Sequence, residues 1–371
     1  MKVQEIKIDN LTRYIVIDDL GLPIIPIAKY IKFLDNRGIS PNSQKTYCFA
    51  LKAYFEYLNE LNINYKDIDI NVLSNFISWL RNPNSSVKVT SITPVKSNRS
   101  ERTINLMITV VTGFYDYLFR IDEFKTNMMD KLMKKMYVGN HRKFKDFLFH
   151  VNKDKPINKN ILKLKTPRKK KVNTLSKDEV EKLYSAANNL RDKLLIRLLF
   201  ETGFRISEAL SLHIEDFIYD HKNGHRIRLV DRGELENKAS LKTGAREVYI
   251  SQELMDLFDD YEYEILDELE VDSDFVFIVL AGKNAGKPLG YRSARAIFEN
   301  LKKKTGIKIH AHLLRHTHAT LYYNKTKDVK QVQERLGHSQ ISTTMDLYVH
   351  PSDKEIRENW NKSQDEFRLG E

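Results

Sequence analysis

The chain has 371 residues, and its 61 Lys and Arg against 50 Asp and Glu give a formal net charge of +11. This length exceeds one typical domain, so we expect two domains, each with its own core. No apolar run reaches the ~18 residues of a membrane span, and the N-terminus MKVQEIKIDN lacks the apolar core of a signal peptide. We therefore expect no membrane contact and a cytoplasmic protein.

The single cysteine, Cys48, excludes an internal disulfide and any zinc site built on several thiolates. It falls in a helical pattern, where we expect a small buried side chain. The positive charge favours a polyanionic partner, because clustered Lys and Arg gain affinity by releasing counterions from phosphates. Charge alone does not show such binding, since many basic proteins simply carry a solvated lysine surface.

The first half of the chain has apolar residues at helical spacing. After an N-terminal segment over 1–24, to which we assign no element, the pattern predicts a helical domain over 25–160. Gly38 would end the first helix and Ser43 would be the N-cap of the second. The predicted helices cover residues 25–38, 40–61, 70–82 and 100–120.

A basic segment over 161–175 separates the two halves. We expect nothing in it to join a core, so it predicts an extended interdomain linker. Beside a nucleic acid it would supply sequence-independent phosphate contacts, although a merely solvated tether explains the composition equally well. The basic residues are Lys163, Lys165, Arg168, Lys169, Lys170 and Lys171.

The second domain is predicted over 176–350, followed by a tail over 351–371. A capping-box pattern from Ser176 to Glu179 begins its first helix. Helical patterns then cover 191–203 and 205–217, strand patterns cover 226–230 and 246–250, and helices resume from Ser251. The whole chain is thus predicted to be mostly α with a small antiparallel β-sheet, an α+β fold.

The stretch HAHLLRHTHAT, residues 310–320, places four histidines around Arg315. One hypothesis is a metal site that includes an i, i+4 histidine pair. The other is a phosphate clamp centred on Arg315, in which only some of the histidines take part. We expect His316 and His318 to pack or to form hydrogen bonds, and His310 to lie on the approach to the site.

Four stretches of the second half together resemble the tyrosine recombinases, the phage integrase family that includes site-specific recombinases and transposon transposases. They are ETGFRISEAL, SLKTGAREV, HLLRHTHAT and LGHSQISTTMDLYVH, and they span much of residues 170–350. The first half resembles the helical core-binding domain of the same family more weakly, through an S-x-x-T pattern and the aromatic-rich helix after it. The resemblance implies a DNA strand-cleaving and rejoining enzyme, with a mobile-element transposase or integrase as the preferred subclass.

Carried over position by position, the resemblance assigns a supporting acid to Glu208 and the nucleophile to Tyr348. Tyr322 and Tyr323 are rivals for the nucleophile, but they follow the H-x-x-R stretch too closely, within the same predicted helix. No metal and no cofactor is implied, and AGKNAGKPLG departs from a P-loop in its glycine spacing and its proline. The six implied catalytic residues are Arg205, Lys242, His312, Arg315, His338 and Tyr348.

The chemistry of these residue types agrees with the resemblance. Two arginines can grip the non-bridging oxygens of a phosphodiester with bidentate forks, which lysine cannot reproduce. A tyrosine hydroxyl with a pKa near ~10 is a weak nucleophile, so His312 or a nearby group would help to remove or share its proton. Lys242 could donate the proton that the leaving 5′ oxygen needs. Attack by Tyr348 would leave a 3′-phosphotyrosine, so resealing would need no external energy source.

The resemblance further implies double-stranded DNA as partner, four protomers in a synaptic complex, and accessory recombination proteins. Integration, excision, transposition and resolution all stay open at this point. Two other classes also stay open: a non-catalytic DNA-binding protein that keeps the clamp for affinity, and a metal-dependent nuclease built on the histidines. Loss of activity on removing the Tyr348 hydroxyl or on adding chelator would separate the three.

Overall fold

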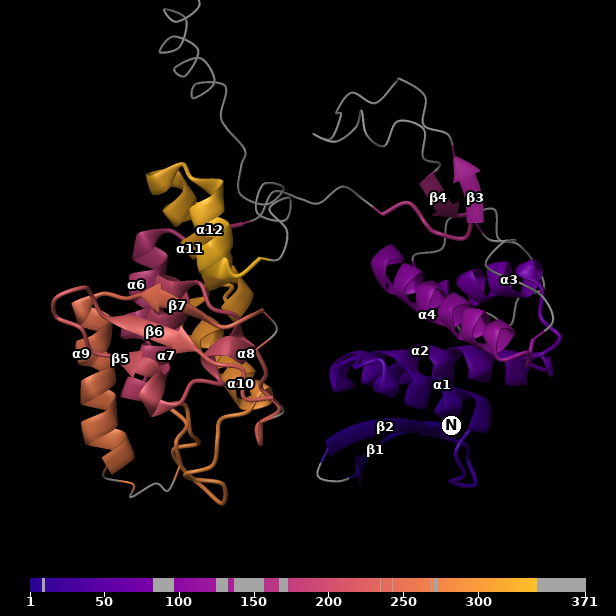
Figure 1. The fold of residues 1–371 in the computed structure, drawn as a ribbon, viewed down its shortest axis with the longest axis horizontal. Helices are drawn as coiled ribbons and strands as arrows, with labels where there is room; N and C mark the ends of the chain where they lie inside the picture. Colours follow the sequence, from indigo (N-terminus) through magenta and orange to yellow (C-terminus); the bar gives the residue numbers. More distant parts are fainter. Residues whose placement is uncertain are drawn as a thin grey trace, which may run out of the picture. The chain divides into compact units, whose positions relative to one another are not determined.

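The computed structural model describes residues 1–8, 11–82, 97–124, 133–136, 157–166, 173–233, 235–241, 243–267, 269 and 273–338. The chain divides into two compact units, Met1–Arg168 and Lys169–Glu371. Helices dominate both, and the described residues form three small antiparallel sheets (Figure 1), which confirms the predicted fold class. Within the described ranges, no helix has the length and apolar character needed to cross a bilayer.

The first unit begins with a hairpin that the sequence analysis did not assign. Strands β1 (Lys2–Ile8) and β2 (Leu11–Ile17) pair antiparallel, with Lys2 opposite Ile17. Along β2 the side chains alternate between buried and more exposed, so that Tyr14 and Val16 join the core beneath the helices. Because side chains alternate sides along a strand, this short pattern suffices to attach the hairpin to the unit.

Four helices build the rest of the first core: α1 (Ile25–Asn36), α2 (Pro41–Glu60), α3 (Ile70–Arg81) and α4 (Glu101–Arg120). Gly38 follows α1 with a positive φ, as expected of a helix stop. The predicted N-cap Ser43 is wrong, because α2 begins earlier with Ser40 as N-cap and Pro41 in the first turn. A proline there loses no helical hydrogen bond and its fixed φ suits the helix.

Cys48 is fully buried on α2, as predicted, and its Sγ lies 3.7 Å from the carbonyl oxygen of Tyr14. Burial raises the pKa of this thiol to about 12, so it is neutral and packs as a small apolar group. Around it the core is rich in aromatic rings, and the hydroxyls of Tyr54 and Tyr115 lie 3.0 Å apart inside it. Cys48 is therefore structural.

Part of the predicted linker belongs to the first unit. Leu162 and Leu164 pack against its core, and both the N–H and the C=O of Leu164 are hydrogen-bonded to the side chain of Asn105, at 2.8 and 3.0 Å. The expectation that nothing in this segment joins a core is wrong here, because alternating leucine and lysine turns the leucines inward and leaves Lys163 and Lys165 exposed. Before it, β3 (Met133–Met136) pairs antiparallel with β4 (Ile157–Asn160). The remaining predicted linker contacts, Arg168, Lys169, Lys170 and Lys171, lie outside the described residues.

The second unit opens with α6 (Lys177–Ser185), whose capping box between Ser176 and Glu179 is present as predicted. Helix α7 (Leu190–Thr202) follows and ends at Gly203 in the left-handed conformation. The predicted helix over 205–217 is only partly formed: α8 covers Ile206–Ala209, and a single 3₁₀ turn covers Ile214–Asp216. Between these two pieces the chain turns so that Leu210 and Leu212 enter the core.

A three-stranded antiparallel sheet lies next in the chain, in the order β5 (Phe217–Ile218), β6 (Arg226–Leu229) and β7 (Arg246–Tyr249). The two longer strands are those that the alternating pattern predicted. Helix α9 (Gln252–Tyr261) follows and continues into a π-helix, Glu262–Asp267. Three more helices come after it: α10 (Tyr291–Thr305), α11 (Ala311–Thr326) and α12 (Val329–Leu336). Helix α11 packs along α7, which brings the histidine-rich stretch beside the end of α7 (Figure 1).

Candidate active site

The predicted site residues gather where α7 ends. Gly203 closes α7 with a φ of +67°, and a Cβ there would lie 2.6 Å from the ring of His318 on α11. Glycine is therefore required both for the backbone conformation and for the close approach of the two helices. Because the chain turns sharply at Gly203, Arg205 becomes the N-cap of α8, with Glu208 one turn later.

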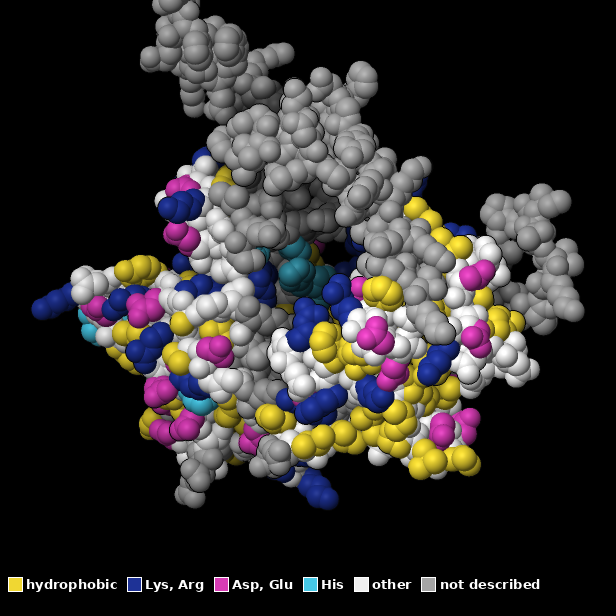
Figure 2. All heavy atoms as spheres, turned by 45° about the vertical axis from the view of Figure 1, so that its right-hand side comes forward, with side chains coloured by type: hydrophobic (Ala, Val, Ile, Leu, Met, Phe, Trp, Pro, Cys, Tyr) yellow, Lys and Arg dark blue, Asp and Glu magenta, His cyan; other side chains and the backbone are white. Residues whose placement is uncertain are grey.

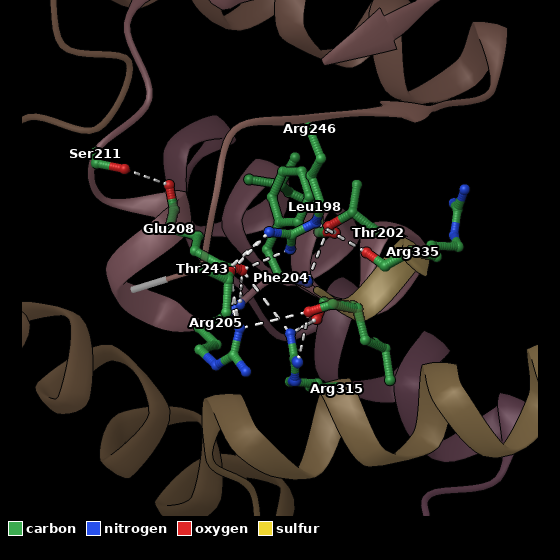
Figure 3. A network of polar contacts seen from close by, with 12 residues as sticks. Leu198, Thr202, Phe204, Arg205, Glu208, Ser211, Thr243, Arg246, Arg315 and Arg335 are labelled. Atoms are coloured by element: carbon green, nitrogen blue, oxygen red, sulfur yellow. Dashed lines mark hydrogen bonds and ion pairs between the residues drawn. The ribbon is translucent and has the colours of Figure 1, made fainter. Parts of the chain in front are cut away.

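Glu208 is the centre of the polar network, and its side chain is fully buried. One oxygen, Oε1, accepts from Arg205 Nη1 at 2.9 Å and from Thr243 Oγ1 at 2.8 Å. The other, Oε2, accepts from the Arg205 backbone N–H and from Arg246 Nη2, each at 2.9 Å. Arg205, Thr243, Arg246 and Arg315 thus converge on one carboxylate from three segments of the chain (Figure 3).

The charge of Glu208 is fixed by these neighbours. Burial alone would raise the pKa of this carboxyl, but the guanidinium of Arg246, the backbone N–H of Arg205 and the charge of Arg315 together lower it to about 2. Glu208 is therefore ionised at neutral pH. Glu208 is thus a buried anion that holds Arg205 and Arg246 by hydrogen bonds, and its role as a supporting acid stays a prediction.

The two predicted clamp arginines are neighbours. Arg315 Nη1 donates to the carbonyl oxygen of Gly203 at 2.7 Å, and its Nη2 donates to the carbonyl oxygen of Leu336 at 2.8 Å. Arg205 Nη1 reaches the same Leu336 oxygen at 3.4 Å, and Arg315 also lies 3.8 Å from Glu208. One carbonyl at the end of α12 and one carboxylate on α8 therefore hold both guanidinium groups together.

His338 and His312 lie beside these arginines. His338 follows the end of α12, where its backbone N–H donates to the carbonyl oxygen of Gln333 at 3.0 Å. Partial burial and the charges of Arg315 and Arg205 lower the pKa of His338 to about 4. Desolvation and the charge of Arg315 also lower the pKa of His312, which is in the first turn of α11. Both rings are neutral at pH 7, so each retains one N–H donor and one acceptor nitrogen.

The other histidines of the stretch have structural contacts. His310 caps α11, with its Nδ1 accepting from the N–H of Leu313 at 3.1 Å. His318 is buried between the carbonyl oxygen of Phe200 at 2.9 Å and Arg335 Nε at 3.1 Å, and burial together with Arg335 lowers its pKa to about 3. His316 packs against His312, with ring centroids 4.4 Å apart. Among described residues, no group of three His, Cys, Asp or Glu side chains could hold a metal ion.

Two predicted residues, Lys242 and Tyr348, lie outside the described part of the chain. The rivals of Tyr348 are visible and engaged in packing. Tyr322 stacks on His318 with ring centroids 5.7 Å apart, and the guanidinium of Arg335 lies 5.2 Å from its ring centroid. Tyr323 carries Lys327 over its ring.

Sequence reasoning missed Thr243, Arg246 and Arg335. Arg335 crosses from α12 to the carbonyl oxygens of Glu201 and Tyr249, at 2.9 and 3.0 Å, and so ties α7, β7 and α12 together. The signal for the other two was their place in SLKTGAREV, a stretch from which only Lys242 was taken. The sequence gives no sign that Thr243 and Arg246 share a partner, because that partner, Glu208, is more than 30 positions away.

A cavity of about 630 Å³ opens next to the network, and Arg205 and His312 are in its wall. Helix α10 contributes Arg295, Lys302 and Glu299 to the lining, and Lys308 follows it, so the wall carries more positive than negative charge. In the space-filling view, histidine side chains lie next to Lys and Arg side chains (Figure 2). Such a wall suits a phosphate-bearing ligand.

Comparison with known proteins agrees with this geometry. Residues 173–355 match the phage integrase family, and residues 27–121 match the N-terminal SAM-like domain of phage integrases. The chain is 41% identical over 367 residues to transposase A from transposon Tn554 of Staphylococcus aureus, covering 98% of each. It is 30% identical over 327 residues to tyrosine recombinase XerH of Campylobacter jejuni, covering 85% of this chain and 76% of the relative.

Solved structures share the fold. The XerH recombinase in a post-cleavage complex with its palindromic difH substrate superposes with a TM-score of 0.57 at 24% identity, covering 90% of this chain and 82% of the other. The Tn1549 transposon integrase with a circular intermediate DNA gives 0.59 at 17% identity, covering 91% and 99%. The resemblance drawn from the sequence is thereby confirmed for both halves, and the chain belongs to the phage integrase family of tyrosine recombinases.

Proposed function

We propose that this protein is a site-specific DNA recombinase of the transposase type, which cleaves and rejoins DNA strands through a 3′-phosphotyrosine on Tyr348. The observation that carries this proposal is the pairing of Arg205 with Arg315 on Glu208 and on the carbonyl oxygen of Leu336. Two permanently charged guanidinium groups held side by side concentrate the positive charge that the non-bridging oxygens of one phosphodiester attract. The transposase subclass is supported by the full-length similarity to transposase A of Tn554.

The proposed reaction balances without an external energy source. The hydroxyl oxygen of Tyr348 attacks phosphorus while the proton of that hydroxyl passes towards His312, whose lowered pKa keeps the ring neutral and able to accept. The bond from phosphorus to the 5′ oxygen breaks, and Lys242 protonates that oxygen. The charge that builds up on phosphorus-bound oxygens is stabilised by the two arginines and by an N–H of His338. A second 5′-hydroxyl then reverses the step and releases Tyr348.

Double-stranded DNA is the proposed substrate, and the basic cavity wall supports it. The basic segment with Lys163, Lys165 and the four residues over 168–171 would add phosphate contacts that do not depend on sequence. We further propose that four protomers assemble on two DNA sites, with accessory recombination proteins, and that the enzyme acts in the cytoplasm. We also propose residues 176–350 as the catalytic domain and 25–160 as the helical DNA-binding domain, to whose core the β1–β2 hairpin and Leu162 and Leu164 are added.

The test is a covalent-capture assay. Wild type and Tyr348→Phe are incubated in chelator with a nicked duplex that carries the end sequence of the element encoding the protein, and products are separated on a denaturing gel. We expect a protein–DNA band in wild type only, because the nick releases a short strand whose loss traps the phosphotyrosine. Tyr322→Phe and Tyr323→Phe are the matched controls, and they should form the band.

The alternatives give different patterns. A band that persists in Tyr348→Phe would overturn the assignment of the nucleophile. Cleavage that chelator abolishes would favour a metal-dependent nuclease. Tight binding of the duplex with no strand reaction in any protein would favour a non-catalytic DNA-binding role.

A further inference from the structure

The side chain of Arg246 forms hydrogen bonds with three partners and lies over one aromatic ring. Its Nη2 donates to Glu208 Oε2 at 2.9 Å, and its Nη1 donates to Thr243 Oγ1 at 3.0 Å. Its Nε donates to the carbonyl oxygen of Arg335 at 3.1 Å. The guanidinium also lies over the ring of Phe204, 5.5 Å from its centroid. Its side chain is mostly buried, so these bonds form in a low dielectric where they are strong.

Thr243 depends on these contacts for its place. Its hydroxyl donates to Glu208 Oε1 at 2.8 Å while it accepts from Arg246 Nη1 and, at 3.3 Å, from Arg205 Nη1. One hydroxyl therefore joins the segment before β7 to the buried carboxylate on α8. Within the chain the residue before Thr243 is Lys242, the proposed proton donor.

The backbone at the end of α12 lies close to the guanidinium of Arg246. Gly337 has a φ of +64°, and a Cβ there would lie 2.7 Å from Arg246 Nη1 and 2.9 Å from Thr243 Oγ1. The backbone at Gly337 thus closes over Arg246 and Thr243, just after the Leu336 carbonyl that binds both clamp arginines. Arg246, at the start of β7, is thus enclosed by α8 and by the end of α12.

We propose that Arg246 is a positioning residue for strand cleavage: it holds Thr243 on Glu208, and thereby sets how the adjoining Lys242 delivers a proton to the leaving 5′ oxygen. This inference rests on the proposed function. In this proposal Arg246 acts through Thr243 and does not itself contact the DNA or the reacting atoms. Only a planar fork can serve Glu208, Thr243 and the Arg335 carbonyl together, so lysine is a poor substitute.

The test uses the chemistry of the leaving group. A substrate with sulfur in place of the bridging 5′ oxygen needs no proton donor, because a thiol has a pKa near ~8.5 and leaves as the thiolate. With the ordinary oxygen substrate we expect Arg246→Lys and Thr243→Val to cleave about 100-fold more slowly than wild type, the size of effect that a lost general acid gives. With the sulfur substrate both should recover to near the wild-type rate, as Lys242→Ala should.

Controls separate positioning from folding. Arg226→Lys makes the same substitution in strand β6, where Arg226 pairs with Asp220 and Glu247 at 3.2 and 3.0 Å, outside the network, and it should cleave both substrates at the wild-type rate. Thr243→Ser keeps the hydroxyl and should recover most of the rate lost in Thr243→Val. Thermal unfolding of each variant checks that the fold persists.

Each outcome bears on a different claim. If wild type forms no covalent complex with either substrate, the proposed function itself fails. If sulfur rescues Lys242→Ala but leaves Arg246→Lys and Thr243→Val slow, Arg246 does not act through Lys242 and the inference is overturned. If Arg246→Lys cleaves the oxygen substrate as fast as wild type, Arg246 has no positioning role.

Discussion

Among single residues, Glu208 should affect the pH dependence of stability most, because it is a fully buried anion between arginines. Its folded-state pKa of about 2 lies below the ordinary 4.5, so the unfolded chain binds the proton first as pH falls. The resulting stability is complete above pH ~4.5 and is lost as pH falls through about 2, a total of about 3 kcal/mol. We expect Glu208→Gln to unfold more easily at pH 7, and this difference to shrink by about 2 kcal/mol on going to pH 3. Denaturant unfolding of both proteins at the two pH values measures it, and a difference independent of pH would contradict it.

A second prediction at this scale concerns His338. Because desolvation and the charges of Arg315 and Arg205 lower its pKa to about 4, the ring should stay neutral well below pH 6.5. A neutral ring can still donate one N–H to a phosphate oxygen. NMR titration of labelled histidine, with His338→Asn for assignment, should show a midpoint near pH 4. Arg205→Gln should raise that midpoint, and an unchanged midpoint would contradict the electrostatic cause.

At the scale of elements, we predict that the backbone conformation at the end of α12 affects both stability and activity. Gly337→Ala forces a left-handed residue and a Cβ against Arg246, whereas Gly306→Ala, at the end of α10, forces the same conformation with nothing within 4 Å. Each should lower the free energy of unfolding by about 1 kcal/mol or more through the backbone. Only Gly337→Ala should also slow covalent capture, because Arg246 and Thr243 must move. Equal rates of covalent capture by the two variants would show that the enclosure of Arg246 does not affect activity.

At the scale of the whole molecule, the basic segment between the units is predicted to bind phosphates. The affinity of a protein for duplex DNA falls with salt in proportion to the phosphates it neutralises, with a slope of about −0.9 per contact. Replacing Arg168, Lys169, Lys170 and Lys171 by serine should therefore make the slope less steep by up to about 4, with similar loss on all sequences. Fluorescence anisotropy at several salt concentrations measures this, and an unchanged slope would mean that the segment is only a solvated tether.

The sequence alone determined the family, the mostly helical fold, the two longer strands of the second unit and the candidate residues. Motif spacing, helical periodicity and capping boxes are local in the chain and can therefore be read from it. It failed where a short local pattern competed with tertiary packing. Helix α2 is capped by Ser40, with Pro41 in its first turn, and not by Ser43. The helix predicted over 205–217 ends after one turn. Leu164, predicted to lie in the linker, is hydrogen-bonded to Asn105 of the first unit.

Only the tertiary structure decided how the site is held. The Leu336 carbonyl bridges Arg205 and Arg315, which are 110 positions apart by their numbers, and Arg246 reaches Glu208 from another element. Such contacts leave no local trace, because hydrogen-bond partners are chosen by the packing of α7, α11, α12 and β7 after they form. Sequence periodicity fixes which residues face inward, but the positions of buried donors and acceptors in space depend on how those elements pack.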